Sequence, residues 1–202
     1  MKQVVRKHLL LDDYRIVDII LAVVIANLFK TDPLWMLIIG ASSTAKTELL
    51  AALDGLPMMF FISDLTVNTL VSGKKDASLL PRLTDKIICM KDFTTILSKR
   101  PDDLKIIMGH LREVYDGKFT KSYGTGDTIN WTGYVGFVGA CTPVYDRKHG
   151  VISQMSERFL SKDSIWQFQN FQSICNIKSF HLLHYAVMAG VLFIVTDTQG
   201  MK

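Results

Sequence analysis

The sequence has few cysteines and few prolines, and these scarcities exclude several classes of protein. It contains 3 cysteines, 5 prolines and 13 glycines in 202 residues, which excludes collagen-like and low-complexity chains. The cysteines are odd in number and far apart (Cys89, Cys141 and Cys175), as is typical of reduced, buried thiols and not of a disulfide framework. Cysteine and histidine do not recur at the spacing of a zinc site.

Long hydrophobic runs are also lacking. The apolar segment 16–29 is only 14 residues long and contains Asp18, whereas a membrane span needs about 20 apolar residues. The basic segment Met1–Lys7 is not followed directly by the apolar stretch of a signal peptide. We therefore expect segment 16–29 to be a buried helix, and we expect a cytoplasmic protein without a membrane partner.

Charge is nearly balanced but unevenly distributed. The chain has 23 Lys+Arg against 19 Asp+Glu, for a net charge of +4. Segment 71–121 alone has eleven basic and seven acidic residues, so the whole excess lies there. Two interpretations stay open at this point: an ordinary solvated surface, or a surface that faces a polyanion.

Short apolar runs alternate with helix-forming segments, which predicts an α/β fold with a parallel sheet flanked by helices. Strands are expected at 34–39, 58–63, 86–90 and 133–141. Helices are expected at 14–28, 48–56, 65–71, 102–115 and 151–160. Segment 118–130 predicts a β-hairpin insertion with its tip at Gly124–Gly126. We divide the chain into an N-terminal helical segment (1–30), a core (31–160) and a poorly periodic C-terminal segment (161–202).

The loop after the first strand has the pattern of a phosphate-binding loop. Segment 40–47 reads GASSTAKT, which matches G-x-x-x-x-G-K-[ST] except that Ala45 replaces the second glycine. Consecutive N–H groups at the start of a helix form an anion nest that the helix dipole reinforces. Lys46 would reach the β- and γ-phosphates, and the Thr47 hydroxyl would ligate Mg²⁺. The candidate ATP-binding residues are Gly40, Ala41, Ser42, Ser43, Thr44, Ala45, Lys46 and Thr47.

Ala45 is the departure that matters in this loop. We expect its position to take a positive φ, which a Cβ disfavours, so the alanine would weaken the site. The alternative interpretation of the whole segment is an ordinary turn of small residues between a strand and a helix.

Three further residues are candidates for chemistry on a triphosphate. Asp92 ends the third strand, where a carboxylate can hold Mg²⁺ through water and polarise the attacking water. Thr142 follows the fourth strand, where a hydroxyl could sense the γ-phosphate. Arg158 could reach across a subunit interface and stabilise charge on the transferring phosphoryl group. The alternatives are a strand-end cap, a turn residue before a proline and a surface salt bridge, and the general base stays open.

Several segments together resemble a known family. LWMLIIGASSTAKTELL, KIICMKDFTTILS and GYVGFVGACTPVYD, with FFISDLTVNTLVSG, LREVYDGKFTKSYG and SERFL, are similar to phage- and plasmid-borne AAA+ ATPases, which are helicase-like DNA-replication proteins. Their layout is similar to that of superfamily 3 and minichromosome-maintenance helicases. The resemblance covers about residues 28–160, and its most specific parts are the phosphate-binding loop and the Lys-Asp-Phe-Thr block.

The resemblance implies an ASCE P-loop core that forms a homo-oligomeric ring, hydrolyses ATP with Mg²⁺ and acts on DNA. It implies that Lys46 and Thr47 are the Walker A pair and that Asp92 is the Walker B acid. It further implies that Thr142 is the first sensor and Arg158 the arginine finger. The hairpin would point into the ring channel, where Lys118, Lys121 and Tyr123 would contact single-stranded DNA by charge and stacking. A plain exposed hairpin is the alternative.

Functions of different classes therefore compete. The first is an ATP-driven, helicase-like enzyme on DNA, favoured by the near-complete Walker pair and Arg158. The second is a degenerate P-loop module that binds nucleotide or DNA without turnover, favoured by Ala45 and the single acid at Asp92. A small-molecule kinase would use the same loop, but the sequence shows no basic lid pattern for a second phosphate substrate.

Overall fold

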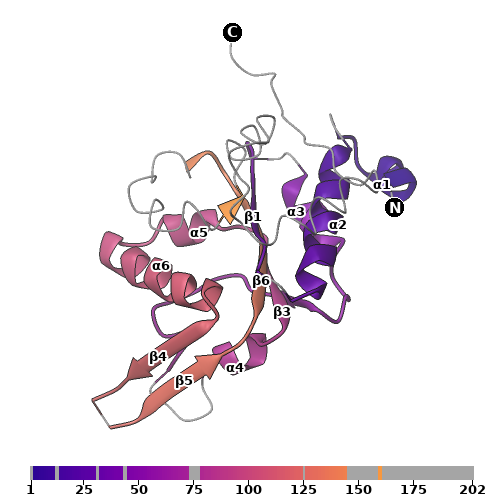
Figure 1. Cartoon of the computed structure of the whole chain (residues 1–202). Coiled ribbons are helices and arrows are strands. Elements are labelled where there is room, and N and C mark those ends of the chain that lie inside the picture. The colour runs from indigo at the N-terminus through magenta and orange to yellow at the C-terminus, as the bar shows by residue number, and fades with distance from the viewer. Residues whose placement is uncertain are drawn as a thin grey trace, which may run out of the picture.

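A parallel β-sheet forms the centre of the protein, between two layers of helices (Figure 1). The computed structural model describes residues 2–11, 14–30, 32–42, 45–72, 78–124, 126–144 and 159–160. The strands of this sheet are β1 (Trp35–Ile39), β2 (Met59–Phe61), β3 (Lys86–Met90), β6 (Val135–Cys141) and β7 (Phe159–Leu160). The expected α/β class, with a parallel sheet flanked by helices, is confirmed.

The strand order places β6 in the middle of the sheet. The five strands run in the order β2-β3-β6-β1-β7, and every neighbouring pair is parallel. Ile39 at the end of β1 pairs with Cys141, and Met90 at the end of β3 pairs with Gly139. β6, which follows the hairpin, therefore lies between β1 and β3. β1 precedes the phosphate-binding pattern, and β3 precedes Asp92.

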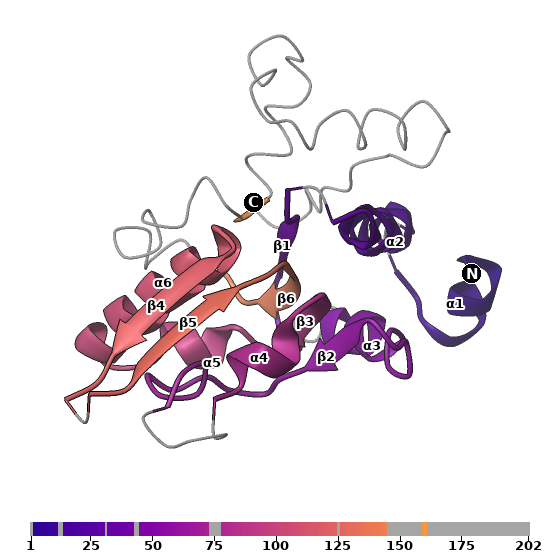
Figure 2. The ribbon, with the colours of Figure 1, turned by 60° about the horizontal axis from the view of Figure 1, so that its bottom comes forward.

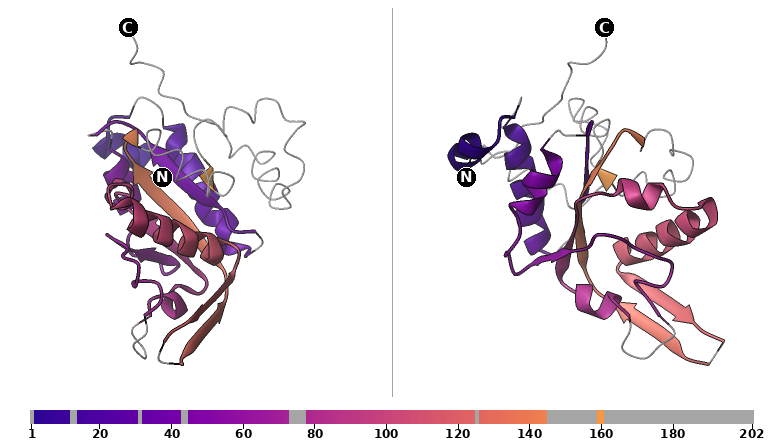
Figure 3. Two further views of the ribbon diagram at one scale, coloured as in Figure 1. Left: turned by 90° about the vertical axis from the view of Figure 1, so that its left-hand side faces the viewer. Right: turned by 180° about the vertical axis from the view of Figure 1, so that it is seen from behind.

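Alternate residues of each central strand enter two different cores. From β1, Trp35 and Leu37 face one core and Met36 faces the other. The first core lies under α4 (Leu80–Leu83), α5 (Thr94–Leu97) and α6 (Pro101–Tyr115). The second core lies under α2 (Arg15–Leu28) and α3 (Lys46–Ala51), with α1 (Lys2–His8) outside them. Figures 2 and 3 show the two helical layers on opposite faces of the sheet.

Helix α2 belongs to the same core as the sheet. Its buried residues include Val17, Ile20 and Val24, which pack with residues of the central strands. The 1–30 segment therefore packs directly on the 31–160 segment. None of the helices in the part of the chain that the structure describes has the length and apolarity needed to cross a membrane.

The predicted hairpin is confirmed. β4 (Lys118–Ser122) and β5 (Thr128–Thr132) pair antiparallel and project away from the sheet, with β4 beside α6 (Figure 1). Phe119 and Trp131 anchor the hairpin in the core, and Trp131 Nε1 donates to Thr84 Oγ1 at 3.0 Å. The His110 ring of α6 meets Phe119 edge-on, with 5.2 Å between ring centroids. Burial, with Lys121 nearby, lowers the pKa of His110 below its ordinary value.

Some predicted elements are wrong in type or extent. Segment 65–71 forms turns and no helix, because Thr69 Oγ1 accepts the N–H of Thr66 at 2.8 Å and offers the backbone a local alternative. The helix expected at 48–56 begins at Lys46 and ends at Ala51. Phe159–Leu160 is a strand paired with β1, while the rest of the helix expected at 151–160 lies outside the described residues, as does segment 161–202. The short helices α1, α4 and α5 were not predicted.

Two of the three cysteines are described, and both fit the expectation of reduced thiols. Cys89 and Cys141 are buried and form no disulfide. Burial raises the pKa of the Cys89 thiol to about 12, so this thiol stays protonated. Cys175 lies outside the described residues.

The buried polar side chain of Asn27 joins α2 to the sheet. Asn27 Nδ2 donates to Val23 O at 2.9 Å and to Leu34 O at 3.0 Å. Asn27 Oδ1 accepts the Leu34 N–H at 3.0 Å and the Tyr134 hydroxyl at 2.7 Å. Gly136 makes room for it, because a Cβ there would lie 2.7 Å from Asn27 side-chain atoms. The amide therefore fixes the entry of both β1 and β6.

Replacement of Asn27 is expected to destabilise the whole domain. Asn27→Ala leaves the partly buried Leu34 N–H without its partner and leaves Leu34 O with only the Phe137 N–H, so we expect the free energy of unfolding to fall by about 2 kcal/mol. Urea denaturation followed by circular dichroism measures the change. Asn68→Ala, at an exposed turn position, is the matched control and should change stability by less than about 0.5 kcal/mol. Equal effects of the two substitutions would contradict the role of Asn27.

Candidate functional site

The carboxyl ends of three adjacent strands lie side by side. The Gly40 N–H donates to Cys141 O at 3.2 Å, so β1 and β6 stay paired one residue beyond β1. The Phe93 N–H donates to Ala140 O at 2.7 Å, which joins the chain after β3 to β6 in the same way. The segments that begin with Gly40, Asp92 and Thr142 therefore leave the sheet along one edge. In open α/β sheets this edge is where ligands bind.

The lysine at the end of the loop after β1 folds back onto the first residues of that loop. Lys46 opens α3, and its Nζ donates to Gly40 O at 2.8 Å and to Ala41 O. Partial burial lowers the pKa of Lys46 below its ordinary value, and the nearby Cys141 and Asp92 oppose that shift. The ammonium is therefore held against the first residues of the loop. Gly40, Ala41, Ser42, Ala45, Lys46 and Thr47 are described, whereas Ser43 and Thr44 lie outside the described residues.

Ala45 has the left-handed backbone expected for its position. Its φ is +54° and its ψ is 8°, and this conformation costs an L-residue about 1–2 kcal/mol. Its carbonyl accepts the Leu49 N–H at 3.0 Å, which closes the first turn of α3. The prediction of a positive φ is confirmed, and the chain turns sharply from β1 into α3 at this residue.

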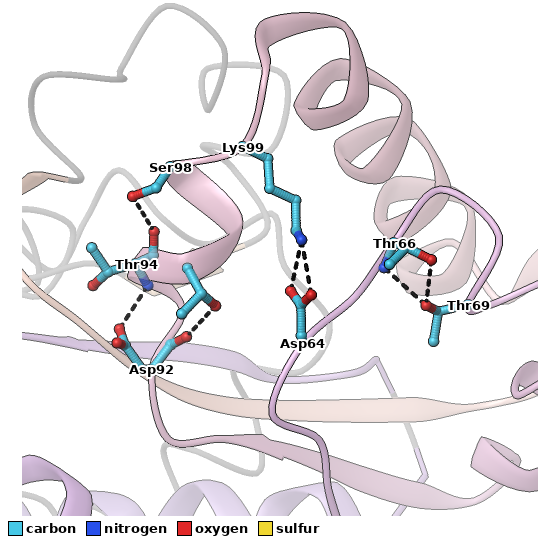
Figure 4. Close-up of polar contacts among 8 residues, drawn as sticks. Asp64, Thr66, Thr69, Asp92, Thr94, Ser98 and Lys99 are labelled. Carbon is cyan, nitrogen blue, oxygen red and sulfur yellow. Dashed lines mark hydrogen bonds and ion pairs between the residues drawn. The ribbon is translucent and has the colours of Figure 1, made fainter.

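Asp92 caps a helix at the end of β3. Its Oδ1 accepts the Thr94 N–H at 2.9 Å, and its main-chain oxygen accepts the Thr95 hydroxyl at 2.9 Å (Figure 4). The strand-end cap weighed as an alternative for Asp92 is therefore present. Among the described residues, no hydrogen bond engages the second carboxylate oxygen, Oδ2, of this exposed side chain. A role for Asp92 at a metal stays a prediction.

Thr142 contacts Thr94, the last residue of the Lys-Asp-Phe-Thr block, to which sequence analysis assigned no role. Its N–H donates to Thr94 Oγ1 at 3.1 Å, and the two hydroxyl oxygens lie 3.3 Å apart. Thr94 therefore contacts both Asp92 and Thr142, although these residues follow different strands. The spacing Asp-x-Thr before a helix is a capping pattern, and it was the available signal for Thr94.

The structure does not bring the three hairpin candidates together. Side chains alternate between the two faces of a strand, so Lys118 shares the exposed face with Thr120 and Ser122. Lys121 and Tyr123 lie on the other face, where Lys121 Nζ is 5.4 Å from the Tyr123 ring centroid. Burial raises the pKa of the Tyr123 phenol. Contact of all three side chains with one DNA strand stays a prediction, and the two lysines lie on opposite faces of the hairpin.

Two further observations on the described residues concern where a ligand could bind. A cavity of about 380 Å³ lies at the opposite edge of the sheet, where Pro33 precedes β1 and Tyr134 precedes β6. Within the described ranges, no three His, Cys, Asp or Glu side chains gather as a metal-binding cluster. Arg158 lies outside the described residues.

The chain matches no protein-family model and no curated protein. A function must therefore be argued from the residues at the carboxyl edge.

Glycine at position 45 is expected to relieve the strain of the loop. Ala45→Gly removes the Cβ from a left-handed backbone, and we expect a gain of about 0.5–1 kcal/mol in unfolding free energy after the entropy of glycine is subtracted. Ala51→Gly, in the right-handed part of α3, is the control and should lose about 0.5–1 kcal/mol. Thermal unfolding of both variants gives the two signs, and a loss in both would contradict the strain at Ala45.

Proposed function

We propose that the protein is an AAA+ type P-loop ATPase that binds Mg²⁺·ATP at the carboxyl edge of its sheet, hydrolyses it and acts on DNA in a helicase-like role in phage or mobile-element replication. One observation carries the proposal. A Walker-type loop, a threonine and an acid leave three adjacent parallel strands along one edge, and the Lys46 ammonium donates to the carbonyls at the start of that loop.

The residues at this edge suit a triphosphate. Lys46 is a cation that already bonds to the carbonyls of Gly40 and Ala41, so a phosphate chain in the loop would lie within its reach. Thr47 is exposed at the start of α3, where its hydroxyl is available to a metal on the phosphates. Mg²⁺ usually keeps several waters and needs only one or two carboxylates besides phosphates, so Thr47 and Asp92 fit it without a larger cluster.

The proposed reaction is hydrolysis of the terminal phosphate. A water oxygen forms a bond to the γ-phosphorus while the bond from that phosphorus to the β–γ bridging oxygen breaks, so ADP leaves and the water proton passes to phosphate or solvent. Bound Mg²⁺ would supply charge neutralisation on the phosphates. Asp92 would orient the water through the carboxylate oxygen that does not cap α5, and Thr142 would hydrogen-bond the γ-phosphate.

A second candidate is a P-loop module that binds nucleotide without turnover. Ala45 holds a backbone that alanine disfavours, and one oxygen of Asp92 is already committed to the cap of α5. Both features would lower catalytic efficiency while leaving the phosphate-binding residues in place. The proposed ring also needs Arg158 from a neighbouring subunit to complete the site.

Nucleotide binding and phosphate release, measured side by side, test the proposal. Lys46→Ala removes a charge-assisted contact to phosphate, and we expect ATP affinity to fall by about 10- to 100-fold. Lys86→Ala is the matched control, because Lys86 Nζ also donates to a main-chain carbonyl, that of Pro57 at 2.8 Å, but Lys86 begins β3 at the opposite edge. Ala45→Gly should bind at least as tightly as the native chain.

The outcomes separate the candidates. Tight binding with phosphate release supports the ATPase, and release that depends on protein concentration supports the ring. Tight nucleotide binding without phosphate release, with or without single-stranded DNA, supports the second candidate, the P-loop module without turnover. Absence of binding in both the native chain and Ala45→Gly would contradict both functions.

The two faces of the hairpin make a separate prediction for DNA. A single strand that stacks on Tyr123 would meet Lys121 and not Lys118. We therefore expect Lys121→Ala to reduce the slope of log K against log salt by about 0.7 and Lys118→Ala to change it by less. Fluorescence anisotropy with labelled single-stranded DNA measures both, with Lys86→Ala as an equal change of charge. Equal slopes for all variants would contradict DNA contact through this face.

A further inference from the structure

We infer that Thr94 is a positioning residue that couples Asp92 to Thr142 and sets whether Thr142 offers a hydrogen-bond donor to the site. Its catalytic meaning rests on the proposed function, but the coupling itself is a property of the protein without nucleotide. Neither the Walker pattern nor the resemblance assigns a role to this residue.

Thr94 forms hydrogen bonds with Asp92 and with Thr142 through different atoms. Its main-chain N–H donates to Asp92 Oδ1 at 2.9 Å and fixes one oxygen of the carboxylate. Its side-chain Oγ1 accepts the Thr142 N–H at 3.1 Å. The end of β3 and the end of β6 are therefore joined through one residue at the start of α5. A shift of the Asp92 carboxylate that moves Thr94 must also move the acceptor of the Thr142 amide.

The Thr94 hydroxyl can donate its proton to either of two acceptors. A threonine hydroxyl has one proton and two acceptor lone pairs, and the Thr142 N–H uses one lone pair of Thr94 Oγ1. Its proton has two possible acceptors, Thr142 Oγ1 at 3.3 Å and Cys141 Sγ at 3.8 Å. The oxygen is the closer and stronger acceptor, whereas the sulfur is a weak one. Both arrangements use partners that are already in place.

The two arrangements present different groups at the edge of the sheet. When Thr94 donates to Thr142 Oγ1, the Thr142 proton is directed elsewhere and can be donated to a ligand. When Thr94 donates to Cys141 Sγ, the Thr142 proton can turn back to Thr94, and Thr142 offers only lone pairs outward. Fully ionised phosphate oxygens only accept hydrogen bonds, so a phosphate beside Thr142 selects the first arrangement. Thr94 thereby prepares Thr142 as a donor.

Amide hydrogen exchange of the protein without nucleotide tests the coupling directly. Thr94→Val keeps the side-chain shape but removes the acceptor of the Thr142 N–H, and we expect exchange of that amide to accelerate about tenfold. Thr94→Ser keeps the hydroxyl and should stay within about threefold of the native rate. Ser98→Ala is the matched control, since Ser98 follows α5 directly and its hydroxyl donates to the Thr94 main-chain oxygen at 2.8 Å, and it should leave Thr142 unchanged.

A double substitution shows that the link runs through Thr94. Asp92→Ala removes the acceptor of the Thr94 N–H, and we expect Thr142 exchange to rise about threefold in the native background. In the Thr94→Val background the same substitution should add nothing. Native exchange rates in Thr94→Val, or an undiminished Asp92→Ala effect in that background, would overturn the coupling.

The rate of phosphate release distinguishes a positioning role of Thr94 from a purely structural one. We expect Thr94→Val to lower kcat for phosphate release about tenfold with KM within about twofold, and Thr94→Ser to restore kcat. Equal losses in Thr94→Val, Thr94→Ser and Ser98→Ala would overturn positioning in favour of simple support of α5. If the native chain releases no phosphate while the exchange results hold, the proposed ATPase fails and the coupling stands.

Discussion

The position of β6 between β1 and β3 is the constraint on which the rest of the structure depends. β6 is buried along its whole length and pairs in parallel on both sides. Because the strands are parallel and in close register, their carboxyl ends meet at one edge. Gly136 lets Asn27 of α2 approach β6 closely, so the same strand also fixes the helical layer on one face. Loss of this pairing would separate the loop after β1 from the acid after β3.

The chemistry of the edge follows from how each chain leaves the sheet. Ala45 turns the chain through a left-handed backbone and starts α3 at Lys46, so the ammonium returns over the beginning of the loop. Asp92 leaves β3 and starts α5 through the Thr94 N–H. Both residues therefore combine a structural task with a proposed functional one. The strained alanine and the partly committed carboxylate therefore belong to the fold as well as to the proposed triphosphate site.

Local patterns predicted much of the fold, whereas contacts between distant segments could not be predicted. The run 86–90 and the hairpin strands carry strong local signals, and both elements form as expected. Strand order has no local signal, and the Thr66–Thr69 turn replaced a helix because hydroxyl and backbone groups compete for the same bonds. The alternation of side chains along β4 is a local signal that separates Lys118 from Lys121, since the two are three residues apart on one strand. The Asp-x-Thr spacing is a local signal for Thr94, but its contact with Thr142 joins residues 48 apart in the chain and has none.

The most direct test of the account is a crystal structure of the chain with Mg²⁺ and a non-hydrolysable ATP analogue. The account predicts that the phosphates lie in the loop 40–47 and that Lys46 Nζ leaves the Gly40 and Ala41 carbonyls for a phosphate oxygen at about 3 Å. It also predicts the metal between Thr47 and Asp92. A nucleotide bound elsewhere, or a loop that holds no phosphate while Lys46 keeps its carbonyl partners, would contradict it.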